Sequence, residues 1–487
     1  MSSPMLLTDS YKLSHRAMYP EGTERLLSNW TARGSRIPGQ EKVVFFGLQY
    51  FLRKYLMEGF EGFFACFDDA NAREYQDFID AFFGPNAVGS NHIQDLQDLG
   101  YLPLEFRALP EGTRTPLRVP MFTIENTHDD FFWLTNYLET IISTTMWLPC
   151  TSATTSQRYR QILDDAALLT GSPPEFVDWQ GHDFSMRGMA GLEAAQLSGA
   201  GHLLYFTGSD TLPAVNLINH YYGKGLPEGY LVASSVPASE HSVVCAGGEE
   251  GERETVLRIL DVVPTGIVSN VSDTWDYWGM LTEILPSVRD HIMERDGKYV
   301  VRPDSGDPVK IIVGDPNAVI GSPEYKGSIE LLWETFGGTT TATGHKLLDG
   351  HIGLIYGDSI TEQRCAAIVE GLHAKEFASG NVVFGIGSYT FNYVTRDTHG
   401  FAMKATWVQI DGEGKAIYKD PKTDDGLKKS AKGRLAVLLD ERGEMALINE
   451  ATLKQEAASL LRPVWRDGDF IYEENFAQIR ERARSHP

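Results

Sequence analysis

The sequence predicts an α/β protein built around a (β/α) barrel, because seven short apolar runs between Phe176 and Phe391 each precede a helical stretch. The runs end at His182-Asp183-Phe184, Gly208-Ser209-Asp210, Ser239-Glu240-His241, Ser272-Asp273, Arg302-Pro303-Asp304, Gly357-Asp358 and Gly385-Ile386-Gly387-Ser388. Loops that follow the strands of such a barrel open on one common face, so residues far apart in sequence meet there. The pattern therefore predicts an enzyme whose site lies at that face.

The patterns divide the chain into residues 1–146, a barrel at 147–391 and residues 392–487. The first part mixes strand-like and helical runs, and within it 103–126 alternates apolar and polar residues as short antiparallel strands do. The last part returns to strands and ends in a predicted helix at 473–484.

Within the barrel, apolar residues at helical spacing predict helices at 188–200, 276–295 and 361–378. The long stretch 307–351 contains a Gly-Gly-Thr-Thr-Thr tract and is expected to be an insertion or a mobile loop. The weakly charged stretch 140–157 is rich in Ser and Thr, which indicates a buried helix end rather than a membrane span.

The composition is that of a globular protein, with 42% hydrophobic and 22% charged residues in a chain of 487. A formal net charge of −23 repels nucleic acid and anionic membranes, so neither is expected as a main partner. An anionic small substrate would need a local cluster of Arg and Lys. Four scattered cysteines, Cys66, Cys150, Cys245 and Cys365, and a start without a basic and apolar leader predict a cytoplasmic protein.

The glycines of Gly385-Ile386-Gly387-Ser388 could expose backbone N–H groups to a phosphate. The spacing is neither a dinucleotide fingerprint nor a P-loop, and a plain tight turn is the alternative. Asp304 could accept hydrogen bonds from sugar hydroxyls while Arg302 meets a phosphate, or the two could simply pair to shape a turn. Gly357-Asp358 offers the same choice.

His241 follows Glu240, a carboxylate that could orient its ring. No Cys/His cluster supports a zinc site, and no metal held by protein ligands is expected. A carboxylate at Asp210 could accept from an amide N–H₂ and would repel a carboxylate ligand. Phe184 and Tyr11 could pack in the core or sandwich a ligand. Arg33, Arg36, Arg396 and Lys404 lie outside the barrel runs, where solvated surface charge is the alternative to a site.

Eight short segments in one order resemble the nicotinamide phosphoribosyltransferase family, whose members have the type II phosphoribosyltransferase fold. They are Leu7-Thr8-Asp9-Ser10-Tyr11-Lys12, Phe46-Gly47-Leu48-Gln49-Tyr50, Trp133-Leu134-Thr135-Asn136, His182-Asp183-Phe184 with Arg187-Gly188, Gly208-Ser209-Asp210-Thr211, Ser235-Val236-Pro237-Ala238 with Glu240-His241-Ser242, Val301-Arg302-Pro303-Asp304-Ser305-Gly306 with Gly357-Asp358, and Thr395-Arg396-Asp397. The match extends to Lys432-Gly433-Arg434-Leu435.

The resemblance implies an irregular α/β barrel with a second α+β lobe built from both chain ends, and a cytoplasmic homodimer with shared sites. It implies a pentosyltransferase that makes nicotinamide mononucleotide in NAD salvage, with Mg²⁺ bound mainly through substrate phosphates and ATP as an optional activator that phosphorylates His241. It implies catalytic roles for His241, Asp304 and Asp210. It implies substrate binding by Asp9, Tyr11, Arg33, Phe184, Arg187, Asp210, Ser235, Ser272, Asp276, Arg302, Asp304, Gly357, Asp358, Gly387, Ser388, Arg396 and Lys404.

The sequence departs from the family pattern at a few positions. Ser388 stands where the family often has a glycine, Ala431 replaces a lysine of a Lys-rich stretch, and Ser185-Met186 replace Gly-Tyr. These changes bear on affinity and ATP coupling. Two alternatives are a nicotinate phosphoribosyltransferase, which Asp210 disfavours, and a catalytically silent barrel, which the presence of Asp304, Asp358, His241 and Arg187 disfavours.

Overall fold

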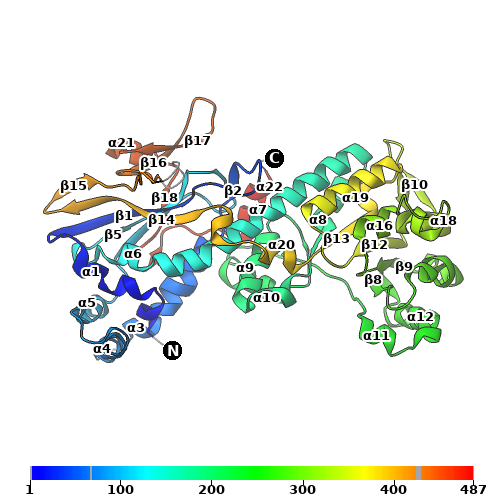
Figure 1. The fold of residues 1–487 in the computed structure, drawn as a ribbon, viewed down its shortest axis with the longest axis horizontal. Helices are drawn as coiled ribbons and strands as arrows, with labels where there is room; N and C mark the ends of the chain where they lie inside the picture. Colours follow the sequence, from blue (N-terminus) through cyan, green and yellow to red (C-terminus); the bar gives the residue numbers. More distant parts are fainter. Residues whose placement is uncertain (1–2, 66–68, 424–428, 486–487) are drawn as a thin grey trace. The chain divides into compact units, whose positions relative to one another are not determined.

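The computed structural model describes residues 3–65, 69–423 and 429–485. It divides into two compact units (Figure 1). Unit 1 comprises Met1–Thr154, Leu217–Glu228 and Val394–His486, and unit 2 comprises Thr155–Asn216 and Gly229–Tyr393. The prediction of a second lobe built from both chain ends is confirmed by unit 1.

Unit 2 is built on a parallel sheet of six strands in the order β7-β6-β13-β12-β9-β8. The strands are β6 (Gly181–Asp183), β7 (Gly208–Ser209), β8 (Thr265–Val271), β9 (Asp296–Arg302), β12 (Ile352–Tyr356) and β13 (Val382–Ile386). Arg302 pairs with Val271, and Ile386 pairs with Asp183. The register therefore brings the carboxyl ends of the strands to one edge, as the predicted barrel requires.

One predicted strand is absent from the described part of unit 2, and this corrects the sequence analysis. The run before Ser239-Glu240-His241 forms only isolated bridges, from Ser234 to β7 and from Ala238 to β8. Pro237 lies between them and has no N–H to donate to a ladder. Because these bridges reach both edge strands, the segment forms the irregular side of the barrel.

Helices follow most strands of unit 2, and α16 and α19 lie side by side (Figure 1). The helices of unit 2 are α8 (Val177–Gln180), α9 (Leu192–His202), α11 (His241–Cys245), α12 (Glu252–Val262), α13 (Tyr277–Gly279), α14 (Leu285–Ser287), α15 (Arg289–Met293), α16 (Pro308–Val313), α17 (Pro323–Lys326), α18 (Ser328–Phe336), α19 (Glu362–Ala374) and α20 (Ser388–Asn392). Two helices, α7 (Glu139–Thr170) and α10 (Leu212–Tyr221), have residues in both units.

Two further predictions about helices and loops are wrong in detail. The predicted helix at 276–295 is broken into short pieces around a π-helical segment, Met280–Ile284, and Pro286 follows it. The expected loop at 307–351 is ordered: Asp307 caps α16 with Pro308 at its first position, and β10 (Gly338–Thr340) pairs with β11 (Lys346–Leu348). The stretch 140–157 forms the largely buried N-terminal half of α7 (Glu139–Thr170), in agreement with the predicted buried helix end.

Unit 1 contains an antiparallel sheet in the order β15-β14-β1-β5-β3-β18-β19. Its strands are β15 (Glu413–Ala416), β14 (Phe401–Ile410), β1 (Thr23–Ala32), β5 (Pro120–Asn126), β3 (Leu104–Ala108), β18 (Arg462–Arg466) and β19 (Asp469–Phe470). Two hairpins accompany it, β2 (Lys42–Val44) with β4 (Arg114–Pro116) and β16 (Leu435–Leu439) with β17 (Met445–Asn449). Buried Trp30, Phe106 and Trp465 are part of the core of this unit.

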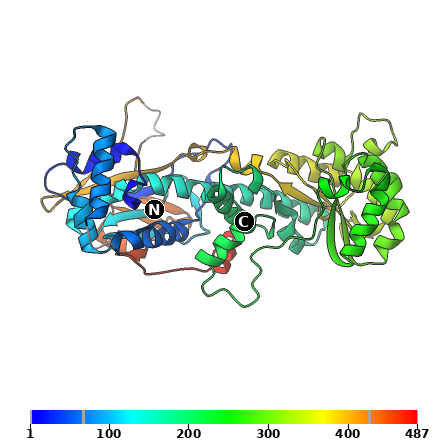
Figure 2. The same ribbon diagram turned by 90° about the horizontal axis from the view of Figure 1, so that it is seen from below.

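The helices of unit 1 include α4 (Ala70–Phe83) and α5 (Asn91–Leu99), which lie side by side in Figures 1 and 2. The others are α1 (His15–Met18), α2 (Leu48–Phe51), α3 (Gly59–Phe64), α6 (Leu134–Tyr137), α21 (Leu453–Ala457) and α22 (Phe476–Arg484). No helix in the described residues is long and apolar enough to cross a membrane. Cys150, Cys245 and Cys365 are free thiols, and Cys66 lies outside the described residues.

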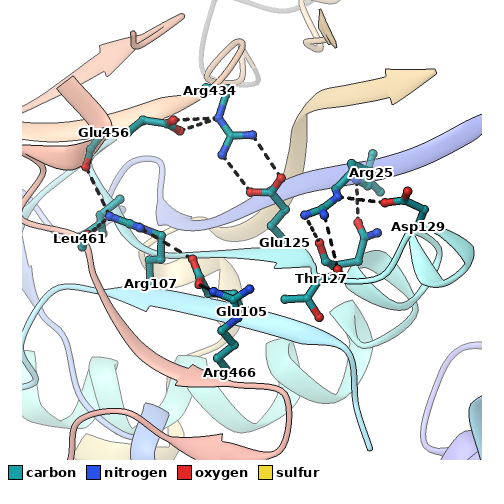
Figure 3. A network of polar contacts seen from close by, with 12 residues as sticks. Arg25, Glu105, Arg107, Glu125, Thr127, Asp129, Arg434, Glu456, Leu461 and Arg466 are labelled. Atoms are coloured by element: carbon teal, nitrogen blue, oxygen red, sulfur yellow. Dashed lines mark hydrogen bonds and ion pairs between the residues drawn. The ribbon is translucent and has the colours of Figure 1, made fainter. Parts of the chain in front are cut away.

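Arg434 belongs to a polar network on unit 1 rather than to an open anion site (Figure 3). Its Nη2 lies 2.9 Å from Glu125 Oε2, and its Nε lies 2.7 Å from Glu456 Oε1. Its guanidinium also covers the Trp407 ring at 4.7 Å. These two carboxylates raise the pKa of Arg434 although burial opposes them. The end of the Lys-rich stretch is therefore anchored to the sheet, while 424–428 lie outside the described residues.

Candidate active site

Unit 2 gathers a strand-end cluster, which we define as His241, Asp273, Arg302 and Asp304. Asp273 follows β8, and its Oδ2 accepts hydrogen bonds from the backbone N–H groups of Asp304 at 2.9 Å and Ser305 at 2.8 Å. The ladder between β8 and β9 creates this contact, because it aligns the ends of the two strands. Asp273 thus fixes the loop that carries Asp304.

His241 faces carboxylates of neighbouring strand ends. Its Nε2 lies 3.9 Å from Asp273 Oδ1 and 3.9 Å from Asp304 Oδ2, and its Nδ1 lies 3.1 Å from Thr274 Oγ1. The expectation that Glu240 orients this ring is wrong, since the Glu240 carboxylate instead accepts a hydrogen bond from Ser242. Although residues 240 and 241 are adjacent in the chain, their side chains contact different partners.

Several polar atoms of the strand-end cluster are buried without a hydrogen-bond partner. They are Asp273 Oδ1, Asp304 Oδ1 and Arg302 Nε. Burial raises the pKa of Asp304, with Arg302 and His241 acting in the opposite direction. Buried polar atoms are normally satisfied, so these atoms indicate a polar ligand. Ribose hydroxyls, which both donate and accept, match that need.

Glycines keep the space around this cluster open. A Cβ on Gly357 would lie 1.7 Å from Asp304 Oδ1, and one on Gly387 would lie 2.9 Å from Asp358 Oδ1. A side chain at Gly357 would therefore displace Asp304. Gly188 meets the Ser388 side chain in the same way, so exposed Arg187 lies near the start of α20. The structure thus brings the predicted Gly357, Asp358, Gly387, Ser388 and Arg187 to the strand ends.

A second group at the strand ends surrounds Asp210. His182 Nε2 lies 2.9 Å from Asp210 Oδ1, and the Ser235 hydroxyl donates to the same oxygen. The rings of His182 and Phe184 lie 4.5 Å apart. Burial alone would raise the pKa of Asp210, but the hydrogen bonds and the charge of Arg302 outweigh it and hold the pKa below its usual value. Asp210 is therefore an ionised acceptor with Oδ2 still available.

Asp210 opens on a cavity of about 660 Å³ within unit 2. His182, Phe184, Ser235 and Arg302 also line it, and its walls continue along apolar residues of the sheet. An aromatic ring can therefore lie against Phe184 with a polar substituent directed at Asp210. Sequence analysis gave His182 and Asp273 no role, although both lie at predicted strand ends, where the same rule would have identified them.

Ser272 and Asp276 occupy structural positions. The buried Ser272 hydroxyl donates to Asn270 O at 2.8 Å, and Asp276 caps α13 by accepting from Gly279 N at 3.0 Å. Their assignment to substrate binding stays a prediction.

Unit 1 gathers a separate cationic cluster, which we define as Lys12, Arg33 and Lys404 around Glu139. Lys12 Nζ lies 2.5 Å from Glu139 Oε2, and Lys404 Nζ lies 3.5 Å from Glu139 Oε1. Arg33 donates from Nε to Gly400 O at 3.1 Å. Burial lowers the pKa of Lys404, and nearby Arg33 and Lys12 lower it further, while Glu139 opposes them.

The other residues predicted outside the barrel lie around this cluster or close to it in sequence. Tyr11 is 55% exposed, with Lys12 Nζ 5.3 Å from its ring centroid. Asp9 Oδ2 accepts from Thr140 Oγ1 at 2.8 Å. Arg396 is exposed and pairs with Asp397, while Arg36 N donates to Thr398 O at 2.8 Å. Asp9, Tyr11 and these cations therefore all belong to unit 1.

Comparisons with known proteins give the family. The model described as the nicotinate phosphoribosyltransferase family matches residues 179–469, and that of the nicotinamide phosphoribosyltransferase N-terminal domain matches 3–106. The chain belongs to the nicotinate phosphoribosyltransferase family. The resemblance seen in the sequence is thereby confirmed.

Relatives and solved structures agree with this family. A nicotinamide phosphoribosyltransferase of Acinetobacter baylyi is 48% identical, with 99% of this chain and 97% of the relative covered. One from Xanthomonas campestris is 36% identical over 98% and 97%. The crystal structure of human nicotinic acid phosphoribosyltransferase shares the fold at a TM-score of 0.56 and 18% identity, over 99% of this chain and 93% of that one. Nicotinate-nucleotide pyrophosphorylase from Pyrococcus furiosus aligns at a TM-score of 0.61 and 15% identity, over 99% and 95%.

Proposed function

We propose that the chain transfers phosphoribose from phosphoribosyl pyrophosphate to nicotinamide, giving nicotinamide mononucleotide and pyrophosphate in NAD salvage. The observation that supports this proposal most directly is the arrangement of hydrogen bonds at the Asp210 carboxylate. Its Oδ1 is occupied by His182 and Ser235, and its Oδ2 stays free to accept from a carboxamide N–H₂. The names and high identity of the relatives support the same substrate.

The transfer requires no protein nucleophile. The C1–O bond to pyrophosphate breaks with its electron pair, the lone pair of the pyridine nitrogen forms the C1–N bond, and the ring becomes a pyridinium. Positioning and charge stabilisation supply the catalysis. Phe184 holds the ring, Asp210 orients its amide, and Asp304 accepts from the ribose hydroxyls. Arg302, Arg187, Gly387 and Ser388 contact phosphate oxygens.

Mg²⁺ suits this chemistry as an ion carried by the substrate. The described residues contain no group of three or more His, Cys, Asp or Glu arranged to hold a metal. Asp273 and Asp304 each keep a buried oxygen without a partner, which suits hydrogen bonding to waters or hydroxyls of a Mg²⁺–pyrophosphate complex. The ion neutralises the leaving group.

The proposed active unit is a cytoplasmic homodimer. Each site combines the strand-end cluster of one subunit with the partner subunit's Tyr11, Arg33, Arg396 and Lys404. Two observations support it: the free thiols of Cys150, Cys245 and Cys365 suit a reducing compartment, and unit 1 carries the exposed Arg396 and the partly exposed Lys404.

ATP is proposed as an activator that phosphorylates His241. The terminal P–O bond of ATP breaks, ADP leaves, and an N–P bond forms at the ring. When Nδ1 donates to Thr274, Nε2 keeps the lone pair for this step. The added charge lies where pyrophosphate binds and recruits Mg²⁺ there.

Product formation from nicotinamide and from nicotinate tests the proposal. We expect nicotinamide mononucleotide with nicotinamide and little product with nicotinate. Asp210→Ala should weaken nicotinamide use by roughly ten- to a hundredfold, because leaving a buried amide unpaired costs about 1–3 kcal/mol. Asp210→Asn is the matched control, since it keeps the shape and removes the charge. Unchanged turnover and preference in Asp210→Ala would contradict the assignment, and a preference for nicotinate in the unaltered protein would favour that alternative.

A further inference from the structure

Glu139 is placed to control the cationic cluster of unit 1. It is the first residue of α7, and it contacts two lysines that are far from it in sequence. Lys12 is 4% exposed and is held at 2.5 Å, so its charge is used within the protein. Lys404 is 33% exposed and lies at 3.5 Å, so its ammonium remains able to contact a ligand.

We propose that Glu139 is a positioning residue for phosphoribosyl pyrophosphate, which holds Lys404 in place while Lys12 anchors the Tyr11 segment. This inference rests on the proposed function. The carboxylate itself repels phosphate, so it acts through the lysines and not by touching the substrate.

The arrangement of charges explains why a carboxylate is needed here. Lys404 on β14 is faced by Arg33 after β1 and by Lys12 of the 3₁₀ turn Ser10–Ser14, and both cations disfavour its charged form. Glu139 on α7 supplies the opposing charge. His15 adds no fixed cation, because burial and the charge of Lys12 lower its pKa. Glu139 is thus the carboxylate that opposes the two neighbouring cations at Lys404.

The neighbouring residue strengthens the same platform. Asp9 N donates to Thr140 Oγ1 at 3.4 Å, and Thr140 Oγ1 donates to Asp9 Oδ2 at 2.8 Å. The start of α7 therefore fixes both the segment that carries Tyr11 and the strand that carries Lys404.

The test measures KM for phosphoribosyl pyrophosphate against pH in Glu139→Gln. We expect KM to rise about tenfold at neutral pH, because a charge-assisted hydrogen bond is lost. The alkaline rise of KM should also begin at lower pH than in the unaltered enzyme, since Lys404 loses the group that favours its charged form. In Glu139→Gln/Lys404→Arg the guanidinium stays charged, so the pH shift should disappear.

Controls separate positioning from folding. Glu444→Gln removes a carboxylate 2.7 Å from Lys42, elsewhere in unit 1, and should leave the profile unchanged. If Glu139→Gln does not fold, Lys12→Met/Glu139→Gln removes both charges of the buried pair and takes its place. A pH profile identical to that of the unaltered enzyme, or a shift that persists with Lys404→Arg, would overturn the inference. Failure of the unaltered enzyme to form nicotinamide mononucleotide would instead contradict the proposed function.

Discussion

The strand-end cluster of unit 2 and the cationic cluster of unit 1 differ in the sign of the charge that predominates in each. In unit 2, Asp273 and Asp304 lie beside His241, Arg302 lies beside Asp304, and burial raises the pKa of Asp304. In unit 1, Lys12, Arg33 and Lys404 crowd around Glu139, and burial lowers the pKa of Lys404. Carboxylates thus predominate in the cluster of unit 2, and basic side chains predominate in the cluster of unit 1. Although the chain has a net charge of −23, basic side chains are thereby concentrated in one cluster.

The largest expected effect comes from Asp304→Ala in unit 2. Each hydrogen bond to a charged group contributes about 1.5–3 kcal/mol, so losing two to ribose should lower kcat/KM by roughly 10²–10⁴. Arg33→Ala in unit 1 should instead raise KM for phosphoribosyl pyrophosphate with a smaller change in kcat. The two clusters would lose their distinct roles if both variants changed only KM.

The next effect concerns His241. His241→Ala should abolish ATP hydrolysis and acid-labile phosphate on the protein, because no other imidazole lies at this place in the strand-end cluster. Transfer without ATP should fall by roughly ten- to a hundredfold but survive, since the positioning groups remain. His241→Asn is the matched control, because the amide can keep a hydrogen bond to Thr274. ATP hydrolysis at the unaltered rate in His241→Ala would remove His241 from the proposed activation.

The smallest expected effect is a change of folding stability with pH, which can be compared between one buried carboxyl in each unit. Burial raises the pKa of Glu111 in unit 1 and of Glu252 in unit 2 to about 7 in both cases. The folded state then holds a proton that the unfolded state loses above about pH 4.3, so stability should fall as pH rises from about 4 to about 7. For fully buried Glu111 the loss is roughly 4 kcal/mol at most.

Substitutions should separate these two carboxyls. Glu111 accepts hydrogen bonds from Gly47 N, Gln49 N and Tyr222 OH, whereas Glu252 Oε1 has no partner. Glu252→Gln should flatten the pH slope and raise Tm above pH 7. Glu111→Gln should flatten the slope and lower Tm, because the amide nitrogen replaces an acceptor. Thermal melts between pH 4 and 8 check this, and unchanged slopes in both variants would refute the assigned protonation.

The two clusters also differ in how far the sequence predicts them. Polar residues at Asp210, Arg302 and Asp358 could be expected to meet, because parallel strands align their carboxyl ends. The contact between Lys12 and Glu139 joins residues 127 apart in the chain, and no strand-end rule relates them. Arg33 and Lys404 could be assigned to a site only through the family resemblance.

Errors in the prediction have the same origin. Glu240 was expected to orient His241 because the two are adjacent, but Asp273 and Asp304 face the ring from neighbouring strands. The stretch 307–351 was expected to be an insertion or a mobile loop because it is long and contains a Gly-Gly-Thr-Thr-Thr tract, but Asp307 and Ser322 cap helices within it. Local composition predicted the barrel well, whereas contacts made by register and capping needed the structure.

Mixing two damaged subunits tests most directly whether each site combines unit 2 of one chain with unit 1 of its partner. Asp304→Ala damages only unit 2, and Arg396→Ala damages only unit 1, so each homodimer should be nearly inactive. A purified heterodimer of the two keeps one undamaged pair of clusters and should recover about half of the unaltered activity, as the symmetry of a dimer requires. Verified heterodimers that stay as inactive as the parent homodimers would contradict the shared site.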